Sequence, residues 1–351
     1  MTFLEYLHAK LPLIDAALDR AQATPLVERL NSIAHQPVAD LERYLYQPLA
    51  HFTAGGGKRV RPVLCLLGAE AVGGQAEEAL SPAVAIELFQ SAALIHDDIA
   101  DESELRRGEP CLYRTQGVGV ATNMGDLALT QVFEAVLTDQ QLASERKLPV
   151  LRELVRMERH TLEGQALDLG WARDRRWDVS TDDYLYMVES KTAWYTRASP
   201  LYIGAVAAGA SEADAQGLIE VGRHAGIAFQ LQDDLLNLVG NAEAQGKDFR
   251  SDITEGKRTL AVVHALAELG ERDRAELVDL LESGTSDTDE LARAVALIEQ
   301  GGGIARCQEL ARQETAATQS AVHRLAAAGT ITADAAEVLL SMADFFVQRD
   351  H

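Results

Sequence analysis

Two short acidic segments hold the side chains with the clearest chemical potential. The first, His-Asp-Asp-Ile-Ala-Asp-Glu at residues 96–102, directly follows the apolar segment 83–95. Residues four apart share one face of a helix, so Asp97 and Asp101 should present their carboxylates together, with Asp98 offset. Carboxylates crowded at the end of a buried segment repel one another unless cations lie among them. This spacing therefore predicts a cation-binding site rather than a solvated acidic patch.

The second acidic segment repeats the pattern. In Phe-Gln-Leu-Gln-Asp-Asp-Leu-Leu-Asn at 229–237, an apolar helix leads into Asp233 and Asp234, and Asn237 supplies an oxygen four residues after Asp233. Two such motifs, far apart in the chain, suggest carboxylates that face each other across a central cavity. Hard oxygen ligands suit Mg²⁺ rather than zinc or copper, and Mg²⁺ favours phosphate oxygens as further ligands. The pair of motifs therefore predicts a phosphorylated substrate.

Basic residues lie near both motifs, although the chain as a whole is acidic. Three glycines at 55–57 precede Lys58, Arg59 and Arg61, in a spacing that is not that of a Walker A loop. Glycines let a ligand approach the backbone closely, and Lys and Arg form charge-assisted hydrogen bonds with phosphate oxygens. Two carboxylate sets with nearby cations fit two diphosphate groups, one held through metal and one held directly. The further cations of this kind are Arg106, Arg107, Lys191, Lys247, Lys257 and Arg258.

Composition limits the partners and the compartment. The 351 residues carry 32 Lys and Arg against 54 Asp and Glu, a net charge of −22, which disfavours binding to nucleic acid or to an anionic membrane. No signal-peptide pattern and no run of 18 or more apolar residues is present, so we expect no membrane anchor. Cys65, Cys111 and Cys307 lie far apart and in no zinc-ligand spacing, which indicates reduced thiols in a cytoplasmic protein.

The elements that must position these motifs are predicted to be helices. Apolar residues recur every three or four positions, strand-like alternation is scarce, and segments 83–95 and 221–232 are apolar enough to be central helices. Ser81 is expected to cap a helix that has Pro82 at its first position. The prediction is an all-α fold in a single domain over residues 1–351. Surface loops are expected at about 138–148, 172–183 and 282–289, and helix ends at Gly73-Gly74, Gly240 and 301–303.

With these motifs, the chain resembles the trans-polyprenyl diphosphate synthases over about residues 25–350. The resemblance implies the isoprenoid synthase fold, antiparallel helices around a deep central cavity, usually in a homodimer. It also implies the 1′-4 condensation of isopentenyl diphosphate with an allylic diphosphate. The landmarks that carry it follow the family's order: Gly56-Gly57-Lys58-Arg59, the first acidic motif with Arg106-Arg107-Gly108, Asn123-Met124-Gly125-Asp126, Gly164-Gln165, Lys191-Thr192, Phe229-Gln230 with the second acidic motif, Glu255-Gly256-Lys257 and Phe345-Phe346-Val347-Gln348-Arg349.

The resemblance implies a role for each motif. Two Mg²⁺ ions would bind at Asp97 and Asp101 and a third at Asp233, with Asp98, Asp234 and Asn237 acting around them or through water. The residues implied for the allylic diphosphate are Arg106, Lys191, Thr192, Gln230, Lys247 and Lys257, and those for isopentenyl diphosphate are Lys58, Arg61, Gln90 and Arg107. Two residues depart from the family pattern, because Asn237 replaces an Asp and Gln90 stands where many relatives have His. Both sites would therefore carry less charge than in those relatives.

Product length should follow from the depth of the cavity below Asp97. Ala93 and Ala92 stand four and five residues before Asp97, where family members that stop at 15 carbons typically carry bulky aromatics. Phe89, about two turns before Asp97, is the first aromatic on that side. We therefore expect a 20-carbon product, geranylgeranyl diphosphate, with products of 30 carbons or more as the alternative. Phe89 could instead face a neighbouring helix, and Phe52 or a partner subunit could set the floor.

Two other functions fit the motifs less well. Terpene cyclases share a motif like the first one, but their usual second motif, of the Asn-Ser-Glu type, is absent here. A non-catalytic subunit of a heteromeric synthase typically lacks one or both acidic motifs, whereas this chain has both.

Overall fold

The structure is a computed structural model that describes residues 1–23, 37–240 and 249–347. Within these ranges the regular structure is helical except for one two-stranded hairpin, so the all-α prediction is confirmed. Contacts divide the chain into two compact units. We call 4–155 with 200–215 the first-motif unit, because it contains Asp97, and 1–3 with 156–199 and 216–351 the second-motif unit, because it contains Asp233. The single domain over residues 1–351 stays a prediction.

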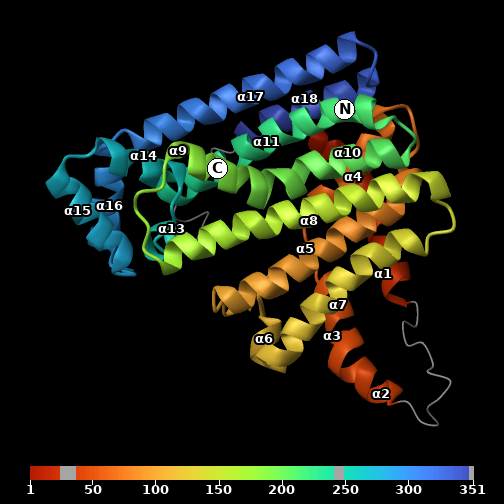
Figure 1. Cartoon of the computed structure of the whole chain (residues 1–351), viewed down its shortest axis with the longest axis horizontal. Helices are drawn as coiled ribbons and strands as arrows, with labels where there is room; N and C mark the ends of the chain where they lie inside the picture. Colours follow the sequence, from red (N-terminus) through yellow and green to blue (C-terminus); the bar gives the residue numbers. More distant parts are fainter. Residues whose placement is uncertain (24–36, 241–248, 348–351) are drawn as a thin grey trace. The chain divides into compact units, whose positions relative to one another are not determined.

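The first-motif unit is organised around a buried helix, α5 (Leu80–Ala100), which lies beside α7 (Val118–Leu137) (Figure 1). Residues 82–92 of α5 are all buried, as expected for a central helix. The segment Ala76–Ala100 is long and apolar enough to cross a membrane, but 72% of its most apolar window is buried inside the protein, which is typical of a core helix. The other elements are α1 (Phe3–Ala23), α2 (Val38–Leu41), η1 (Glu42–Tyr46), α3 (Gln47–Ala54), α4 (Val60–Ala71), η2 (Ala76–Ala79), β1 (Leu105–Arg106), β2 (Glu109–Pro110), α6 (Leu112–Gln116), the first part of α8 (Ser144–Arg173) and most of α10 (Ser199–Ala207).

The start of α5 differs from the prediction. The 3₁₀ turn η2, which Gln75 and Glu78 close with a capping box, leads directly into α5. Ser81 therefore lies inside the helix, and its hydroxyl donates a hydrogen bond to Oδ2 of Asp139 at 2.5 Å. Pro82 is tolerated because it lies in the first turn, where its missing N–H is not required. The predicted Ser81 cap was wrong because the turn before it already supplies the capping interaction.

The second-motif unit is built around α11 (Glu212–Val239). Ile227, Leu231, Leu235 and Leu238 recur every three or four residues and are buried in one apolar core with residues of α14. This leaves the polar residues of the second motif on the remaining faces of α11. The other elements are α9 (Thr181–Val188), η3 (Glu189–Ala198), α13 (Ser251–Thr254), α14 (Leu260–Glu268), α15 (Glu271–Glu282), α16 (Thr288–Gln300), the adjacent pair α17 (Gly303–Ala327) and α18 (Ala333–Val347) (Figure 1), and the latter part of α8.

The predicted loops are confirmed and are shorter than expected. They span residues 138–143, 174–180 and 283–287. The first is shorter because α8 already begins at Ser144, with Glu145 in its first turn, where a negative charge interacts favourably with the helix dipole. Helix ends also occur where predicted, with α11 ending just before Gly240 and α16 separated from α17 by Gly301-Gly302.

Candidate active site

The first acidic motif lies at the C-terminal end of α5. Asp97 is in the last turn, and Asp101 is the capping residue, whose backbone N–H donates to the carbonyl oxygen of Asp97 at 2.8 Å. The two residues are therefore one helical turn apart, as their spacing predicted. Asp98 differs from both because its side chain is only 2% exposed. Its Oδ1 accepts hydrogen bonds from Nε of Arg106 at 2.9 Å and from Nη2 at 2.5 Å.

A tight hairpin returns the chain to this motif. Strands β1 and β2 pair Arg106 with Glu109, and the two residues between them, Arg107 and Gly108, have φ angles of 55° and 83°. Two consecutive positive φ angles are typical of the primed turns that match the twist of a hairpin, and glycine at the second position makes such a turn accessible. The turn directs Arg106 back to Asp98 and places Arg107 beside a different segment.

Arg107 lies against the glycine-rich segment before α4. Its Nη1 donates to the carbonyl oxygen of Phe52 at 3.4 Å, and its guanidinium lies 5.9 Å from the centre of the Phe52 ring. A methyl group added at Gly57 would be 3.1 Å from Nη2 of Arg107. Burial lowers the pKa of Arg107, and the nearby charges of Arg59 and Arg106 lower it further, whereas those of Glu87 and Asp98 oppose the shift. Because Arg59 and Arg106 are each paired with a carboxylate, Arg107 is the arginine here whose charge favours an anionic ligand.

The three cations after the glycines do not play the same part. Arg59 is buried, with an ion pair to Glu87 at 2.5 Å, a longer one to Asp15 at 3.3 Å, and a hydrogen bond from Nη2 to the carbonyl oxygen of Thr53 at 2.9 Å. Arg59 therefore stabilises the fold, and it is not available to a ligand as the sequence had suggested. Lys58 is exposed and Arg61 is half-buried.

Gln90 lies in the same unit, on α5, and is only 8% exposed. Its Oε1 is buried and has no hydrogen-bond partner among the described residues. An unpaired buried acceptor is costly unless a ligand or an ordered water satisfies it. This observation is consistent with a ligand at the position that the resemblance gave to isopentenyl diphosphate.

The residues proposed to limit the depth of the cavity, and so the product length, lie on α5 before the first acidic motif. Phe89 and Ala92 are both buried, at 2% and 0% exposure, and Ala92 belongs to a core cluster with Leu49 and Met124. Ala93, in contrast, is half-buried. Of the two alanines, Ala93 is therefore the one that is accessible from outside the core.

The second acidic motif opens onto a cavity of about 140 Å³ within the second-motif unit. Seven of the residues assigned by resemblance lie around it, together with others that the sequence did not single out. The lining residues are Asp168, Tyr184, Met187, Val188, Lys191, Thr192, Gln230, Asp233, Asp234, Asn237, Asp252, Lys257, Arg258 and Thr259. The predicted residue Lys247 lies outside the described residues.

Asp234 is the most constrained carboxylate at this cavity. It is 5% exposed, and it accepts hydrogen bonds from the Tyr184 hydroxyl at 2.6 Å and from Nε2 of Gln230 at 2.8 Å. Burial and the charges of Asp252 and Asp233 raise the pKa of Asp234 to about 7, although both hydrogen bonds oppose the shift. Burial also raises the pKa of Asp252. Negative charge is thus in excess on this side of the cavity.

Two lysines lie close to these carboxylates. Nζ of Lys191 is 2.5 Å from Asp168, and Nζ of Lys257 is 3.2 Å from Asp252 and 2.8 Å from Glu255. Burial works against the charged form of Lys257, but the charges of Asp252 and Glu255 outweigh burial and raise its pKa. The carboxylates therefore keep this lysine protonated beside the cavity.

Asn237 has a role that an aspartate could not fill in the same way. Its Oδ1 accepts from the backbone N–H of Asp252 at 3.2 Å, and its Nδ2 donates to Oγ of Ser251 at 3.1 Å. A carboxylate is an acceptor only, whereas an amide both donates and accepts. Asn237 therefore ties the end of α11 to the start of α13 and positions Asp252.

Sequence reasoning missed Asp168, Tyr184 and Asp252 as parts of this site. Spacing offered a signal for two of them, because Asp168 lies three residues after Gln165 and Tyr184 seven before Lys191, in each case on the same helical face. Asp252 stands five residues before Lys257 in a segment that had been noted only for its basic residues. Its contact with Asn237 joins residues that are 15 apart in the sequence, a separation that helical spacing does not predict.

The carboxylates fit a magnesium site in which substrate phosphates would complete the coordination shell of the metal. Within the described ranges, no three His, Cys, Asp or Glu side chains are grouped closely enough to hold a metal by themselves. Mg²⁺ commonly takes one or two carboxylates and completes its shell with water and substrate phosphates. Oδ2 of Asp98 is buried with no hydrogen-bond partner among the described residues, and the pKa of Asp234 is raised to about 7. A divalent cation, directly or through water, would give Oδ2 of Asp98 a partner and would balance the excess carboxylate charge around Asp234.

Comparisons with known proteins agree with these motifs. The family model for polyprenyl synthetase matches residues 42–298. A short chain isoprenyl diphosphate synthase from Methanothermobacter thermautotrophicus is 38% identical over 303 residues, which cover 86% of this chain and 89% of that protein. A geranylfarnesyl diphosphate synthase from Natronomonas pharaonis is 35% identical over 331 residues, covering 90% of this chain and 92% of that protein.

Solved structures show the same fold. The geranylgeranyl pyrophosphate synthetase of Pyrococcus horikoshii superposes with a TM-score of 0.85 at 32% identity, covering 99% of this chain and 98% of that one. A geranylgeranyl pyrophosphate synthase of Corynebacterium glutamicum, complexed with isoprenyl diphosphate and magnesium, has a TM-score of 0.79 at 27% identity and covers 96% of this chain and 98% of that one. The chain therefore belongs to the polyprenyl synthetase family and has the isoprenoid synthase fold.

Proposed function

We propose that this protein is a magnesium-dependent prenyltransferase that condenses isopentenyl diphosphate with an allylic diphosphate. The observation that carries the proposal is the pairing of each acidic motif with nearby cations. Asp98 binds Arg106 in one unit, and in the other the second motif shares a cavity with Lys191 and Lys257. Such sites suit a phosphorylated substrate bound through metal.

The metal would be held by Asp97 and Asp101 in one unit and by Asp233 in the other, for about three ions in all. When bound, Mg²⁺ supplies positive charge that stabilises a leaving diphosphate. Support comes from the Corynebacterium glutamicum relative, whose structure contains magnesium and isoprenyl diphosphate, and from the excess carboxylate charge around Asp234. Asp98 acts through Arg106, which it orients, rather than as a separate anion.

The allylic diphosphate would be bound by Arg106, Lys191, Thr192 and Lys257. The ion pairs of both lysines with Asp168 and Asp252 keep their ammonium groups oriented near the cavity. Charge-assisted hydrogen bonds from such groups to phosphate oxygens strengthen as charge develops on the leaving group. Gln230 donates a hydrogen bond to Asp234, so we propose that it positions that carboxylate and does not bind the diphosphate.

Isopentenyl diphosphate would be bound in the first-motif unit by Lys58, Arg61 and Arg107, with Gln90 beside them. The contact of Arg107 with Gly57 brings the hairpin turn and the glycine-rich segment together at one place. The unpaired acceptor of Gln90 supports a ligand there.

The expected product has 20 carbons. The family relatives include short-chain, geranylgeranyl and geranylfarnesyl synthases. The half-buried residue one turn before Asp97 on α5 is Ala93, whose small side chain favours a product longer than 15 carbons. The first experiment incubates the protein with Mg²⁺, labelled isopentenyl diphosphate and farnesyl diphosphate, and sizes the dephosphorylated products. A dominant 20-carbon alcohol supports the proposal, a ladder to 30 carbons or more contradicts the length alone, and no incorporation with any primer contradicts the function.

Two variants test the floor of the cavity. Ala93→Phe should shorten the product, because an aromatic ring would fill the space beside that residue. Ala92→Phe, at the other position where 15-carbon synthases typically carry aromatics, should instead destabilise the protein by about 1–3 kcal/mol through overpacking, because Ala92 is fully buried. Product sizing and thermal unfolding of both variants separate these effects, and an unchanged product with Ala93→Phe would exclude Ala93 from the cavity.

A homodimer is supported by an apolar stripe on α8. Leu148, Val155, Leu162 and Leu169 recur every seven residues and are 64%, 53%, 60% and 40% exposed. A seven-residue apolar repeat on a helix surface is typical of a helix–helix interface, and the second copy of the chain is the proposed partner. Sedimentation of the wild type and of Leu162→Glu would test this, with a dimer expected only for the wild type.

The three cysteines are free and buried, which is consistent with the proposed cytoplasmic location.

A further inference from the structure

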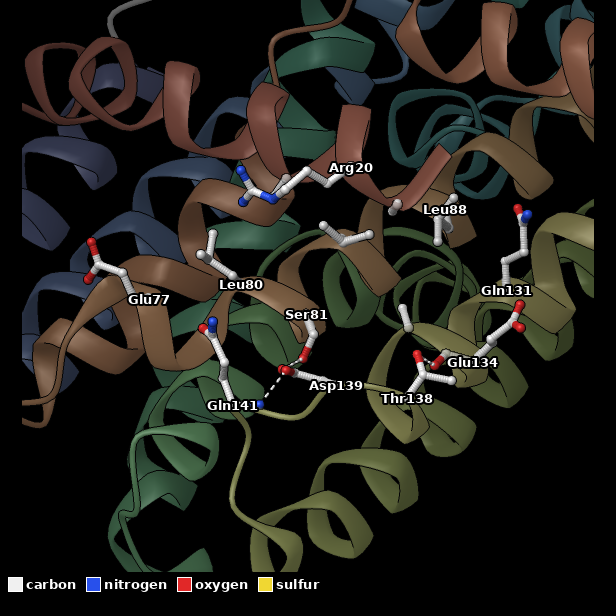
Figure 2. Close-up of a pocket in the computed structure, with 14 residues that line it drawn as sticks. Arg20, Glu77, Leu80, Ser81, Leu88, Gln131, Glu134, Thr138, Asp139 and Gln141 are labelled. Carbon is white, nitrogen blue, oxygen red and sulfur yellow. Dashed lines mark hydrogen bonds between the residues drawn. The ribbon is translucent and has the colours of Figure 1, made fainter. Parts of the chain in front are cut away.

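We propose that the first-motif unit contains a second binding site, for a small amphiphile with an aliphatic body and an ammonium head. The site is a cavity of about 400 Å³ between the end of α1, the start of α5 and the end of α7 (Figure 2). This volume is in the range of pockets that hold one small organic molecule. None of the residues that we assign to the diphosphates lines it.

The cavity lies on the far side of α5 from the first acidic motif. The residues of α5 that line it are Leu80, Ser81, Val84 and Leu88. At about 100° per residue along a helix, Leu88 points roughly 180° away from Asp97, and Val84 points within about 40° of that opposite direction. The body of α5 therefore separates this cavity from the carboxylates of the motif.

An unpaired polar atom indicates that the cavity binds a hydrogen-bond donor. Gln131, on α7, is only 6% exposed and lines the cavity. Its Oε1 is buried and has no hydrogen-bond partner within the described part of the chain. Because an unsatisfied buried acceptor destabilises a protein, a donor brought by a ligand would be favourable at this atom.

The charges around the cavity favour a cation. Glu134 lies one turn after Gln131 and beside it in Figure 2, is half-buried, and forms no ion pair with the residues that the structure describes. Glu77 and Asp139 also line the cavity, against the single arginine Arg20. Asp139 is already bound to the Ser81 hydroxyl and to the backbone N–H of Gln141. An ammonium group can therefore pair with Glu134 and donate to Gln131, whereas a diphosphate or carboxylate would be repelled.

The rest of the lining selects an aliphatic body. Its apolar members are Ala17, Ala21, Leu80, Val84, Leu88 and Ala135, with no aromatic ring among the lining residues. A quaternary ammonium ion is usually recognised by aromatic rings. A primary alkylammonium, which has N–H donors, is thus the better match.

The probe for this site is n-octylammonium, with octanoate as the anion of equal length. Calorimetric titration should show octylammonium binding to the wild type with about one equivalent and no binding of octanoate. Glu134→Gln and Gln131→Leu should each weaken binding by about tenfold, because each removes one partner of the head group. Val84→Trp should abolish binding by filling the cavity. Glu145→Gln, at an exposed carboxylate outside the cavity, is the matched control and should bind as the wild type does.

Several results would overturn the proposal. These are no octylammonium binding below millimolar concentration, equal binding of octanoate, or unchanged binding by Val84→Trp and Glu134→Gln, which would place the amine elsewhere. Thermal unfolding and prenyl transfer are measured on every variant, and both should be retained by Val84→Trp because that residue faces away from Asp97. If Val84→Trp does not fold, Ala135→Leu provides a smaller cavity-filling change. The site is independent of the proposed function, so failure of one does not entail failure of the other.

Discussion

The two acidic motifs look alike in sequence, but their middle aspartates are stabilised in different ways. Asp98 and Asp234 are both buried, at 1% and 5% exposure. Asp98 is paired with the guanidinium of Arg106, whereas Asp234 accepts hydrogen bonds from two uncharged groups, those of Tyr184 and Gln230. Neutral donors do not offset a buried negative charge as an ion pair does, so Asp234, with its acidic neighbours, retains its proton to higher pH. The same pattern thus produces an ion-paired aspartate in one unit and, in the other, an aspartate among excess carboxylates.

The largest expected effect comes from removing the outer aspartates that both motifs share. Asp97→Ala and Asp233→Ala should each lower turnover by about a thousandfold or more, because each removes an oxygen ligand that positions the leaving diphosphate. Steady-state prenyl transfer at saturating Mg²⁺ measures this. Asp289→Ala, at an exposed position in the first turn of α16, is the control. Retention of a tenth of the wild-type rate by either variant would contradict the ligand role.

Removing a partner of Asp98 should lower the free energy of unfolding more than removing a partner of Asp234. Arg106→Met leaves the Asp98 carboxylate buried without a cation, and we expect a loss of about 3 kcal/mol. Tyr184→Phe removes one hydrogen bond from a group that can stay protonated, with a loss of about 1 kcal/mol. Urea unfolding of the two variants makes the comparison. Equal losses would show that the two aspartates are not stabilised differently.

The pH dependence of stability should come from the second motif. In the metal-free protein the pKa of Asp234 is about 7, above its value in the unfolded chain. The folded state therefore binds more protons between about pH 4 and 7, so stability is highest below that window and falls as pH rises through it. Between pH 5 and 7 the loss should be about 2 kcal/mol. Unfolding midpoints across this range should show the slope in the wild type and a clearly smaller slope in Asp234→Asn, where Asp252 still has a raised pKa at this cavity.

Metal provides a further check on the same slope. A divalent cation favours the ionised form of Asp234, so Mg²⁺ with inorganic diphosphate should flatten the pH dependence of the wild type. A slope that is unchanged by Asp234→Asn, or by added Mg²⁺ and diphosphate, would assign the titration to another group.

The smallest expected effect is that of making the second motif more like the first. Asn237→Asp should change turnover by less than about threefold, because the amide serves mainly to hold Ser251 and Asp252. It also places another negative charge near Asp234, which should steepen the pH dependence described above. A large gain in turnover would instead mean that position 237 contributes directly to metal binding.

Much of the fold and of the site could be predicted from the sequence. Helical periodicity predicted the all-α class, and Asp97 and Asp101 occur one turn apart as their spacing required. Seven residues around the second cavity carried roles that the resemblance implied, whereas Asp168, Tyr184 and Asp252, which also line it, carried none. Spacing placed Asp168 and Tyr184 on suitable helical faces, but the role of each of the three depends on a contact with a residue distant in sequence.

Local sequence patterns by themselves determined the helices, the two carboxylate motifs and the cations beside them, because helical periodicity and charge spacing act over only a few residues. Tertiary structure decided which of these groups are available. Only the packing of the chain showed that Arg59 forms an ion pair with Glu87 and that Ala92 lies in the core. It also gave Asp98 a cationic partner and Asp234 uncharged hydrogen-bond donors. The reason is physical: the pKa and the availability of a side chain depend on burial and on partners that here include residues 8 and 50 positions away, which spacing along the chain does not specify.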